Sequence, residues 1–189
     1  NVFNELKAPM GVYSILGNHD YGDYVEWPSE EAKKANLQRL CDFHAQLGFR
    51  LMRNENLKIT RNGQSIEVLG LENWGRGGFS KYGDIVKTLE GTSADSFKIL
   101  LSHDPTQWEE QVMNRPETIH LTLSGHTHGM QFGFEIPGLV KFSPVQFRYK
   151  RWAGLYTENS RYLYVNRGFG YIGFPGRVGI WPEITVLTL

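Results

Sequence analysis

This 189-residue chain has little cysteine: Cys41 stands alone, so no disulfide can form within the chain. Neither sign of charge is in excess, because 20 Lys and Arg residues balance 20 Asp and Glu residues. A balanced charge creates no global field toward nucleic acid or an acidic membrane surface, and we expect no nucleic-acid partner. The sequence also lacks apolar runs of membrane-spanning length, a signal-peptide pattern, internal repeats and low-complexity tracts.

The apolar pattern predicts an α/β fold in a chain long enough for one ordinary core. We expect strands at 12–16, 49–52, 57–60, 65–71, 97–101, 119–123 and 184–189, and helices at about 29–47, 81–89 and 106–113. Asn62-Gly63 is typical of a tight hairpin turn, and residues 157–160 predict a second hairpin. Strands alternate with helices first and antiparallel hairpins come last, which favours a mixed sheet.

Three segments share one form, in which an apolar strand runs into a small residue and then into a cluster of Asn, His or Asp. They read Gly-Asn-His-Asp at 17–20, Ser-His-Asp-Pro at 102–105 and Ser-Gly-His-Thr-His-Gly at 124–129. Imidazole and amide-oxygen donors at the carboxyl ends of neighbouring strands make a metal site, because the sheet fixes their mutual geometry. One such segment is weak evidence, whereas three together hold four of the six histidines and indicate metal chemistry.

In this order the three segments resemble the last three motifs of the calcineurin-like metallophosphoesterases. The continuation Gly125–Gln131, with 165–168 and 182–184, is similar to that family's G-H-T-H-G-G-Q branch, although Met130 replaces its second glycine. This branch includes small bacterial phosphohydrolases, some of which act on nucleotide-sugar lipids. The resemblance implies a mixed-sheet four-layer α/β/β/α sandwich. It also implies metal-dependent hydrolysis of a phosphate ester or pyrophosphate bond, with a phosphorylated small molecule or a nucleotide-sugar or lipid as substrate.

The family's first two motifs, D-x-H and G-D, have no counterpart before residue 17. The D-x-H pattern at 42–44 and the G-D pattern at 83–84 come after G-N-H-D, so they stand in the wrong order for the family. We therefore expect residues 1–189 to be the carboxyl-terminal part of a single metallophosphoesterase domain that lacks its first strands and helices. Such a part would be inactive alone and would leave a sheet uncovered, which favours a homodimer of the fragment. Membrane association through an amino-terminal segment, and the compartment, stay open.

The resemblance implies two divalent metal ions in the intact enzyme, either Mn, Zn, Fe or Mg. Asn18, His103 and His126 would bind one ion, and His128 the other. His19 would contact the phosphate and protonate the leaving oxygen, with Asp20 orienting it. Each of these residues also has a simpler structural interpretation. Asn18 and Asp20 suit a turn or cap, and the histidines could end strands. Without the missing carboxylates we expect one weakly held ion.

Other candidates are weaker. The basic and aromatic segment 141–152 could grip a nucleotide or anionic headgroup, but a solvated loop with inward aromatics is the favoured interpretation. Arg167 and Arg177 are open candidates for phosphate contacts, and His44 and His120 are interpreted as structural. The alternative function, from a different class, is a non-catalytic binding domain that retains metal-site histidines as remnants.

Overall fold

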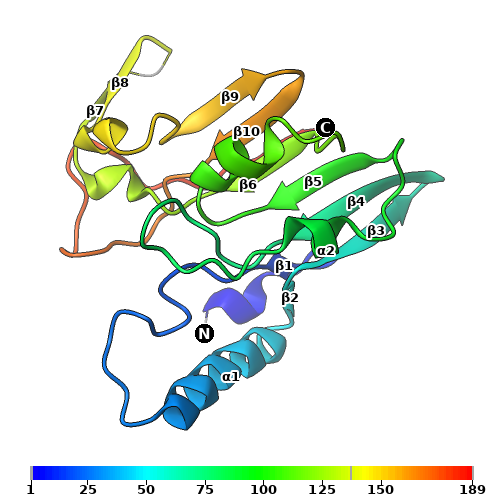
Figure 1. Ribbon diagram of the computed structural model, residues 1–189. Helices are drawn as coiled ribbons and strands as arrows, with labels where there is room; N and C mark the ends of the chain where they lie inside the picture. Colours follow the sequence, from blue (N-terminus) through cyan, green and yellow to red (C-terminus); the bar gives the residue numbers. More distant parts are fainter. Residues whose placement is uncertain (1, 137, 189) are drawn as a thin grey trace.

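A six-stranded mixed sheet forms the centre of the molecule (Figure 1). The computed structural model describes residues 2–136 and 138–188. Along the sheet the strands run in the order β3 (Glu55–Arg61), β4 (Gln64–Gly70), β5 (Phe97–Leu101), β6 (Leu121–Ser124), β10 (Arg161–Val165) and β9 (Gly154–Glu158). Two smaller sheets pair β1 (Tyr13–Ser14) with β2 (Arg50–Leu51), and β7 (Phe134–Ile136) with β8 (Val140–Phe142). The predicted mixed α/β class is therefore confirmed.

The four inner strands β4, β5, β6 and β10 are parallel, and β3 and β9 pair with them antiparallel at the two edges. In register, Gly70 lies opposite Leu101, Leu101 opposite Leu123, and Ser124 opposite Val165. The carboxyl ends of the inner strands thus come to the same edge of the sheet. The loops that leave this edge carry the second and third histidine motifs.

The main core packs one face of this sheet against the helical segments α2 (Ile85–Leu89) and η2 (Trp108–Val112). Its members are apolar and buried: Leu69, Leu71, Ile85, Leu89, Leu100, Trp108, Val112, Ile119, Leu163 and Val165. Near the other end of the chain a second cluster surrounds η4 (Pro144–Phe147) and comprises Val145, Tyr149, Trp152, Ala153 and Ile180. The two clusters fix the strands whose ends carry the candidate site.

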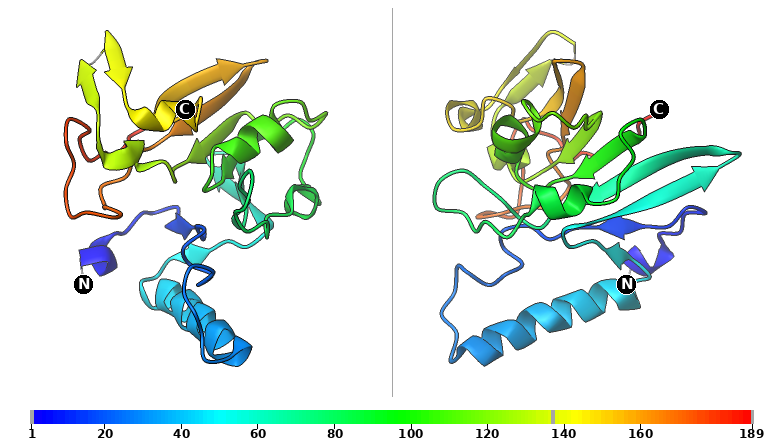
Figure 2. Two further views of the ribbon diagram at one scale, coloured as in Figure 1. Left: turned by 60° about the vertical axis from the view of Figure 1, so that its left-hand side comes forward. Right: turned by 45° about the vertical axis from the view of Figure 1, so that its right-hand side comes forward.

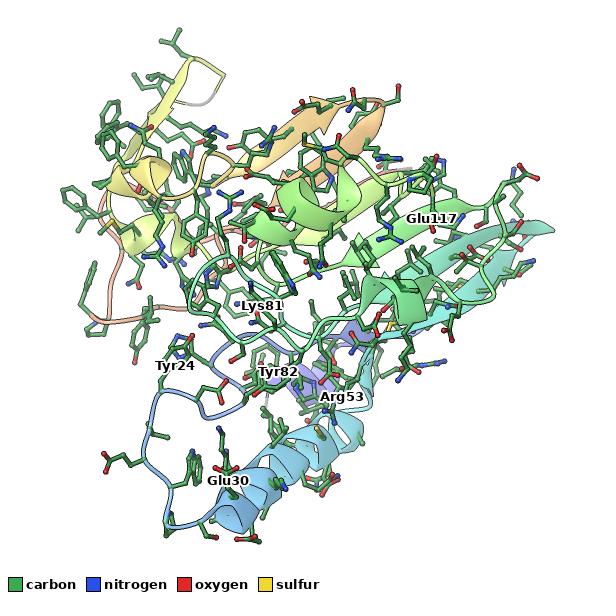
Figure 3. All side chains as sticks on the ribbon, viewed as in Figure 1. Tyr24, Glu30, Arg53, Lys81, Tyr82 and Glu117 are labelled. Carbon is green, nitrogen blue, oxygen red and sulfur yellow. The ribbon has the colours of Figure 1, made fainter. Side chains whose placement is uncertain are left out.

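Helix α1 (Glu30–Gln46) begins where the sequence predicts, because the Ser29 side chain accepts a hydrogen bond from Ala32 N at 3.2 Å. It lies apart from the central sheet in both views of Figure 2, and no residue within it is fully buried. Figure 3 shows Arg53 and Tyr82 between this helix and the body of the molecule. None of the helices in 2–136 and 138–188 has the length and apolar character needed to cross a bilayer.

Several predicted elements match, and the mismatches have physical reasons. The 97–101 strand and both hairpins are confirmed, with Asn62, Gly63, Asn159 and Ser160 all at positive φ. The expected 12–16 strand shortens to β1, since only Tyr13 and Ser14 find a partner in β2. The helices at 81–89 and 106–113 shorten to α2, which is capped by Asp84, and to π-helical η2.

Two further expectations concern the later part of the chain. No strand forms over 184–188, and Leu189 lies outside the described residues. Ile184 and Val186 are 83% and 89% exposed, and no neighbouring strand offers backbone partners to this segment. The described residues form one six-stranded mixed sheet and two small sheets, which is consistent with the mixed α/β fold that the resemblance implies. The short strands β7 and β8 were missed.

Candidate metal centre

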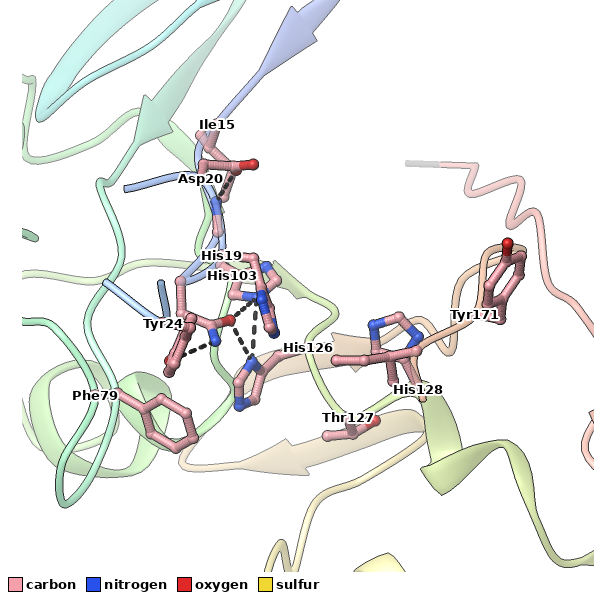
Figure 4. Close-up of a pocket in the computed structure, with 13 residues that line it drawn as sticks. Ile15, His19, Asp20, Tyr24, Phe79, His103, His126, Thr127, His128 and Tyr171 are labelled. Atoms are coloured by element: carbon pink, nitrogen blue, oxygen red, sulfur yellow. Dashed lines mark hydrogen bonds between the residues drawn. The ribbon is translucent and has the colours of Figure 1, made fainter. Parts of the chain in front are cut away.

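A pocket of about 660 Å³ opens at the carboxyl edge of the sheet (Figure 4). All six residues for which the sequence predicts a site role line it. The lining residues are Ile15, Gly17, Asn18, His19, Asp20, Tyr24, Phe79, His103, His126, Thr127, His128, Tyr171 and Ile172. They come from the loops that follow β1, β4, β5, β6 and β10, so segments far apart in the sequence meet here.

Three of the predicted ligands bring their donor atoms to one point. Asn18 Oδ1 lies 2.9 Å from His103 Nε2 and 3.0 Å from His126 Nδ1, and the two imidazole nitrogens are 3.1 Å apart. The Asn18 amide is held in this orientation because its Nδ2 donates to Tyr24 Oη at 2.8 Å. Asn18 is almost fully buried, at 3% exposure. The oxygen, rather than the amide nitrogen, therefore faces the two imidazoles.

The spacing of these three atoms fits a shared cation. Ligands about 2.1 Å from one ion at right angles to each other are roughly 3 Å apart, which the three observed distances match. All three donors are neutral, and neutral imidazole suits zinc, copper, iron and nickel. Among the residues that the structure describes, no group of three or more His, Cys, Asp or Glu side chains is arranged to hold a metal. The set accordingly fits part of a coordination sphere, with further ligands needed to complete it.

Burial keeps these imidazoles uncharged. It lowers the pKa of His103 to about 3, and the neighbouring His126, His128 and His19 lower it further in the same direction. Burial also lowers the pKa of His126, although the Asp104 carboxylate opposes that shift. A neutral imidazole has a free lone pair, so burial prepares both rings to act as ligands.

His128 lies apart from the three converging donors, toward Tyr171 (Figure 4). Its Nδ1 is buried without a hydrogen-bond partner, and burial lowers its pKa, with Arg177 and His19 contributing. A buried nitrogen without a partner is costly unless it faces a ligand. His128 therefore also has the properties of a ligand, but for a different position in the pocket.

The turn that carries both histidines has an unusual backbone. His126, His128, Met130 and Gln131 have φ of 68°, 52°, 54° and 55°, a region that side chains rarely adopt. Such strain persists only where surrounding contacts enforce it, and it concentrates at functional sites. Here the Thr127 hydroxyl donates to Trp152 O and the Ser143 hydroxyl donates to Gly129 O, both at 2.8 Å.

His19 and Asp20 occupy different positions relative to the pocket. The exposed His19 ring lies beside Tyr24, with ring centroids 4.7 Å apart. Asp20 Oδ2 accepts a hydrogen bond from Gly17 N at 2.7 Å, and Figure 4 shows it directed away from the histidine cluster. No hydrogen bond joins Asp20 to His19 within the described ranges. The geometry thus gives Asp20 the capping arrangement instead of the orienting one that the resemblance implies.

Most of the basic candidates are engaged within the chain. Arg167 pairs with Glu135 and Glu183, and Arg177 donates to the carbonyl oxygens of His128, Arg167 and Gly170. In the segment 141–152, Lys141 donates to Ala153 O, and Arg151 pairs with Glu109 and Glu158. Tyr149 and Trp152 turn inward. The inward aromatics match the favoured interpretation of the segment, except for Phe147, which is 83% exposed, whereas Lys141 and Arg151 are paired within the chain and not simply solvated.

Two further histidines take structural positions, as predicted. His44 Nδ1 lies 2.9 Å from Ser14 Oγ, and His120 Nδ1 accepts from Lys98 N at 3.1 Å while its ring stacks on Phe97. Neither lines the pocket.

The sequence analysis gave three residues of the site region no role at the metal centre: Asp104, Tyr149 and Gln131. Asp104 Oδ2 lies 3.4 Å from His126 Nε2, and Tyr149 Oη lies 2.8 Å from the same nitrogen. Gln131 is fully buried and binds the backbone of residues 172–176. Asp104 and Gln131 stand inside the histidine motifs, which was an available signal, whereas only the fold brings Tyr149 to His126.

Comparison with known proteins agrees with the geometry. A family model described as calcineurin-like phosphoesterase matches residues 1–130. An uncharacterized metallophosphoesterase of Bacillus subtilis, YkuE, is 33% identical over the whole chain, which covers 59% of that protein. A transmembrane protein with metallophosphoesterase domain from Bos taurus is 31% identical over 98% of the chain, which covers 40% of that protein. No solved structure gave a significant match.

Proposed function

The chain belongs to the calcineurin-like phosphoesterase family, and from this membership we propose that the protein hydrolyses phosphate esters with the help of divalent metal ions. Family membership implies phosphoester hydrolysis and divalent metals in general terms. The activity of this protein, its ion and its substrate are our proposals, because the chain spans 59% and 40% of the two relatives named above.

The observation that carries the proposal is the convergence of Asn18 Oδ1, His103 Nε2 and His126 Nδ1 within 3.1 Å of one another. These residues are separated by up to 108 positions in the sequence. Their burial and their convergence on one point favour a shared cation there. We propose that these three hold one ion and that His128, with its unpartnered Nδ1, helps to hold a second.

A divalent cation held by these residues would neutralise phosphate oxygens and activate water for attack on the phosphate at neutral pH. The chain's own residues prepare the pocket for this chemistry. Burial keeps His103 and His126 neutral and therefore able to donate lone pairs. Tyr24 fixes the Asn18 amide, so that its oxygen points inward.

We propose that His19 contacts the substrate phosphate and gives a proton to the leaving oxygen. Its ring lines the pocket beside Tyr24 and is exposed, so substrate can reach it. Tyr24, Phe79, Tyr171 and Ile172 line the same pocket. Their flat and apolar surfaces favour a phosphorylated small molecule with an aromatic or apolar group next to the phosphate.

The test is turnover of an aryl phosphodiester by the full-length protein after chelation and after addition of Mn²⁺. We expect activity only with metal, and a loss of at least about 100-fold in His103→Ala and in His126→Ala, since even outer partners of metal ligands contribute 10- to 100-fold. His44→Gln is the matched control, because His44 contacts Ser14 away from the pocket. Turnover that needs no metal, or that survives His126→Ala, would contradict this proposal, and no turnover with any added metal would favour the non-catalytic alternative.

A further inference from the structure

Asp104 is a buried carboxylate with one satisfied and one unsatisfied oxygen. It is 1% exposed. Its Oδ1 accepts hydrogen bonds from Thr106 N at 2.8 Å and from Thr106 Oγ1 at 2.7 Å. Its Oδ2 is buried without a hydrogen-bond partner and lies 3.4 Å from His126 Nε2. A buried carboxylate oxygen without a partner is strongly unfavourable, so the neighbouring nitrogen has to compensate for it.

The backbone holds this oxygen in place. A Cβ atom on Gly75 would lie 2.5 Å from Asp104 Oδ2, so the main chain of residue 75 packs directly against the carboxylate. Thr106 fixes the other oxygen through two hydrogen bonds. The Asp104 carboxyl group is therefore held in place on the Nε2 side of the His126 ring.

Tyr149 approaches the same nitrogen from the second core cluster. Its hydroxyl lies 2.8 Å from His126 Nε2, and its ring meets the imidazole edge-on with centroids 5.4 Å apart. Two oxygens thus face Nε2, while Nδ1 on the opposite side of the ring faces Asn18 and His103. The two nitrogens of His126 have different surroundings.

These surroundings select one of the two neutral tautomers. With the proton on Nδ1, the Nε2 lone pair would face the Asp104 carboxylate, and two negative ends would meet in a buried space. With the proton on Nε2, the N–H points at Tyr149 Oη, 2.8 Å from the nitrogen, and Asp104 Oδ2 lies nearby at 3.4 Å, while the Nδ1 lone pair faces Asn18 and His103. Carboxylate and hydroxyl oxygens behind a metal-binding histidine have this effect in general.

We propose that Asp104 and Tyr149 are positioning residues that keep the proton of His126 on Nε2, so that Nδ1 is free to bind a metal ion. This inference rests on the proposed function for the role of the ion. The tautomer itself is a property of the metal-free chain and can be measured separately.

The first experiment is long-range ¹H–¹⁵N correlation NMR of the metal-free, full-length protein with ¹⁵N-labelled histidine, using His126→Gln to assign the signal. We expect the Nε2–H tautomer in the wild type and a shift of population toward Nδ1–H in Asp104→Asn. Asn retains the oxygen that accepts from Thr106, so this variant keeps the local turn. If Asp104→Asn does not fold, the tautomers of Tyr149→Phe and of the wild type test the proposal. Nδ1–H as the main wild-type tautomer would overturn it.

The second experiment is calorimetric titration of the same proteins with Mn²⁺ and with Zn²⁺. We expect Asp104→Asn to weaken binding by about 10- to 100-fold, the effect typical of partners behind a metal ligand. Glu67→Gln is the control. Glu67 is also a buried carboxylate, but it bonds Ser93 and Ser96 outside the pocket. Unchanged affinity and tautomer in Asp104→Asn would overturn the proposal. A wild type that shows Nε2–H but binds neither ion would instead contradict the proposed function.

Discussion

Asn18 and His103 approach closely because a glycine precedes the asparagine. A Cβ atom on Gly17 would lie 2.7 Å from the His103 ring, a distance that ordinary packing does not allow. The same residue donates its N–H to Asp20, which fixes the turn. A small residue at this point is thus needed for the imidazole to reach the asparagine oxygen.

Gly17→Ala should therefore displace His103 and weaken metal binding. The added methyl group must move the ring or the turn, and overpacking of this kind costs about 1–3 kcal/mol. Calorimetry with Mn²⁺ measures the affinity, and Gly78→Ala is the control because nothing lies within 4 Å of a Cβ at that position. Equal Mn²⁺ affinity in the two variants would show that metal binding does not depend on the present position of His103.

Acid should destabilise the metal-free protein before its carboxylates are protonated. His103 titrates near 6.5 when unfolded, whereas burial lowers its pKa to about 3 in the folded chain. Between these two pKa values the unfolded state binds more protons than the folded state. The stabilisation from His103 is therefore present above the unfolded pKa and is lost as pH falls. The loss is at most about 1.4 kcal/mol per pH unit for each such histidine. Urea unfolding in chelator at about pH 7, 6 and 5 measures the slope.

His103→Gln should reduce that slope, because Gln does not titrate. His126 and His128 retain lowered pKa values in this variant and account for the remainder. Stability that stays constant between about pH 7 and pH 5 would contradict neutral, buried imidazoles in the folded chain.

At the scale of elements, parallel strands and one strained turn position the site. β5 and β6 deliver His103 and His126 from aligned carboxyl ends. The turn after β6 then holds Gln131, whose buried side chain donates to Phe174 O at 2.9 Å and to Gly176 O at 2.5 Å and accepts from Ile172 N. This amide connects the histidine turn to the loop that brings Tyr171 and Ile172 to the pocket.

Gln131→Ala should loosen the 172–176 loop. Three hydrogen bonds disappear and two carbonyl oxygens lose their donor, so we expect a loss of roughly 2–4 kcal/mol in unfolding free energy. Hydrogen exchange should show faster opening of this loop. Gln38→Ala, on the surface of α1, should change stability by less than about 0.5 kcal/mol. Unchanged protection of 172–176 in Gln131→Ala would show that other contacts hold the loop.

Elements with strong local signals could be predicted from the sequence. The apolar run 97–101, the Asn62-Gly63 turn and the helix that starts near Ser29 each depend on neighbouring residues, and each is found as predicted. The strand expected at 184–189 depends on a partner strand that local residues do not specify, and none pairs with 184–188. Strands β7 and β8 were missed because Gly133, Pro137 and Gly138 hide their short pattern.

The residues of the candidate site likewise include some that the sequence predicts and some that it does not. The histidine motifs predicted Asn18, His103 and His126 as a group, and the fold brings their donor atoms together, while the role of metal ligands stays a prediction. The motif neighbour Asp20 was expected beside His19 and caps Gly17 instead. Tyr149 meets His126 only through tertiary structure, so spacing in the sequence could not indicate it, whereas Asp104 stands inside the second histidine motif.

At the scale of the whole molecule, large apolar side chains remain on the surface. Phe147, Trp181, Ile184 and Val186 are each at least 75% exposed. The β7–β8 hairpin projects from the body in all three views of Figures 1 and 2. Exposed apolar area of this kind favours association.

We predict that residues 1–189, prepared alone, associate with increasing concentration. Burial of these side chains against a second copy removes apolar surface from water, which is the main favourable term in association. Sedimentation velocity over a range of concentrations measures this, and the double variant Trp181→Ser, Val186→Ser should shift the equilibrium toward monomer. A monomer at every concentration would contradict the prediction.

Anomalous diffraction from crystals of the full-length protein grown with Mn²⁺ or Zn²⁺ tests most directly whether the histidine motifs build a metal centre. We predict an anomalous peak about 2.0–2.3 Å from Asn18 Oδ1, His103 Nε2 and His126 Nδ1 together. A peak that lies elsewhere in the molecule, or no peak in crystals whose protein binds the ion in solution, would contradict the assignment of these three residues.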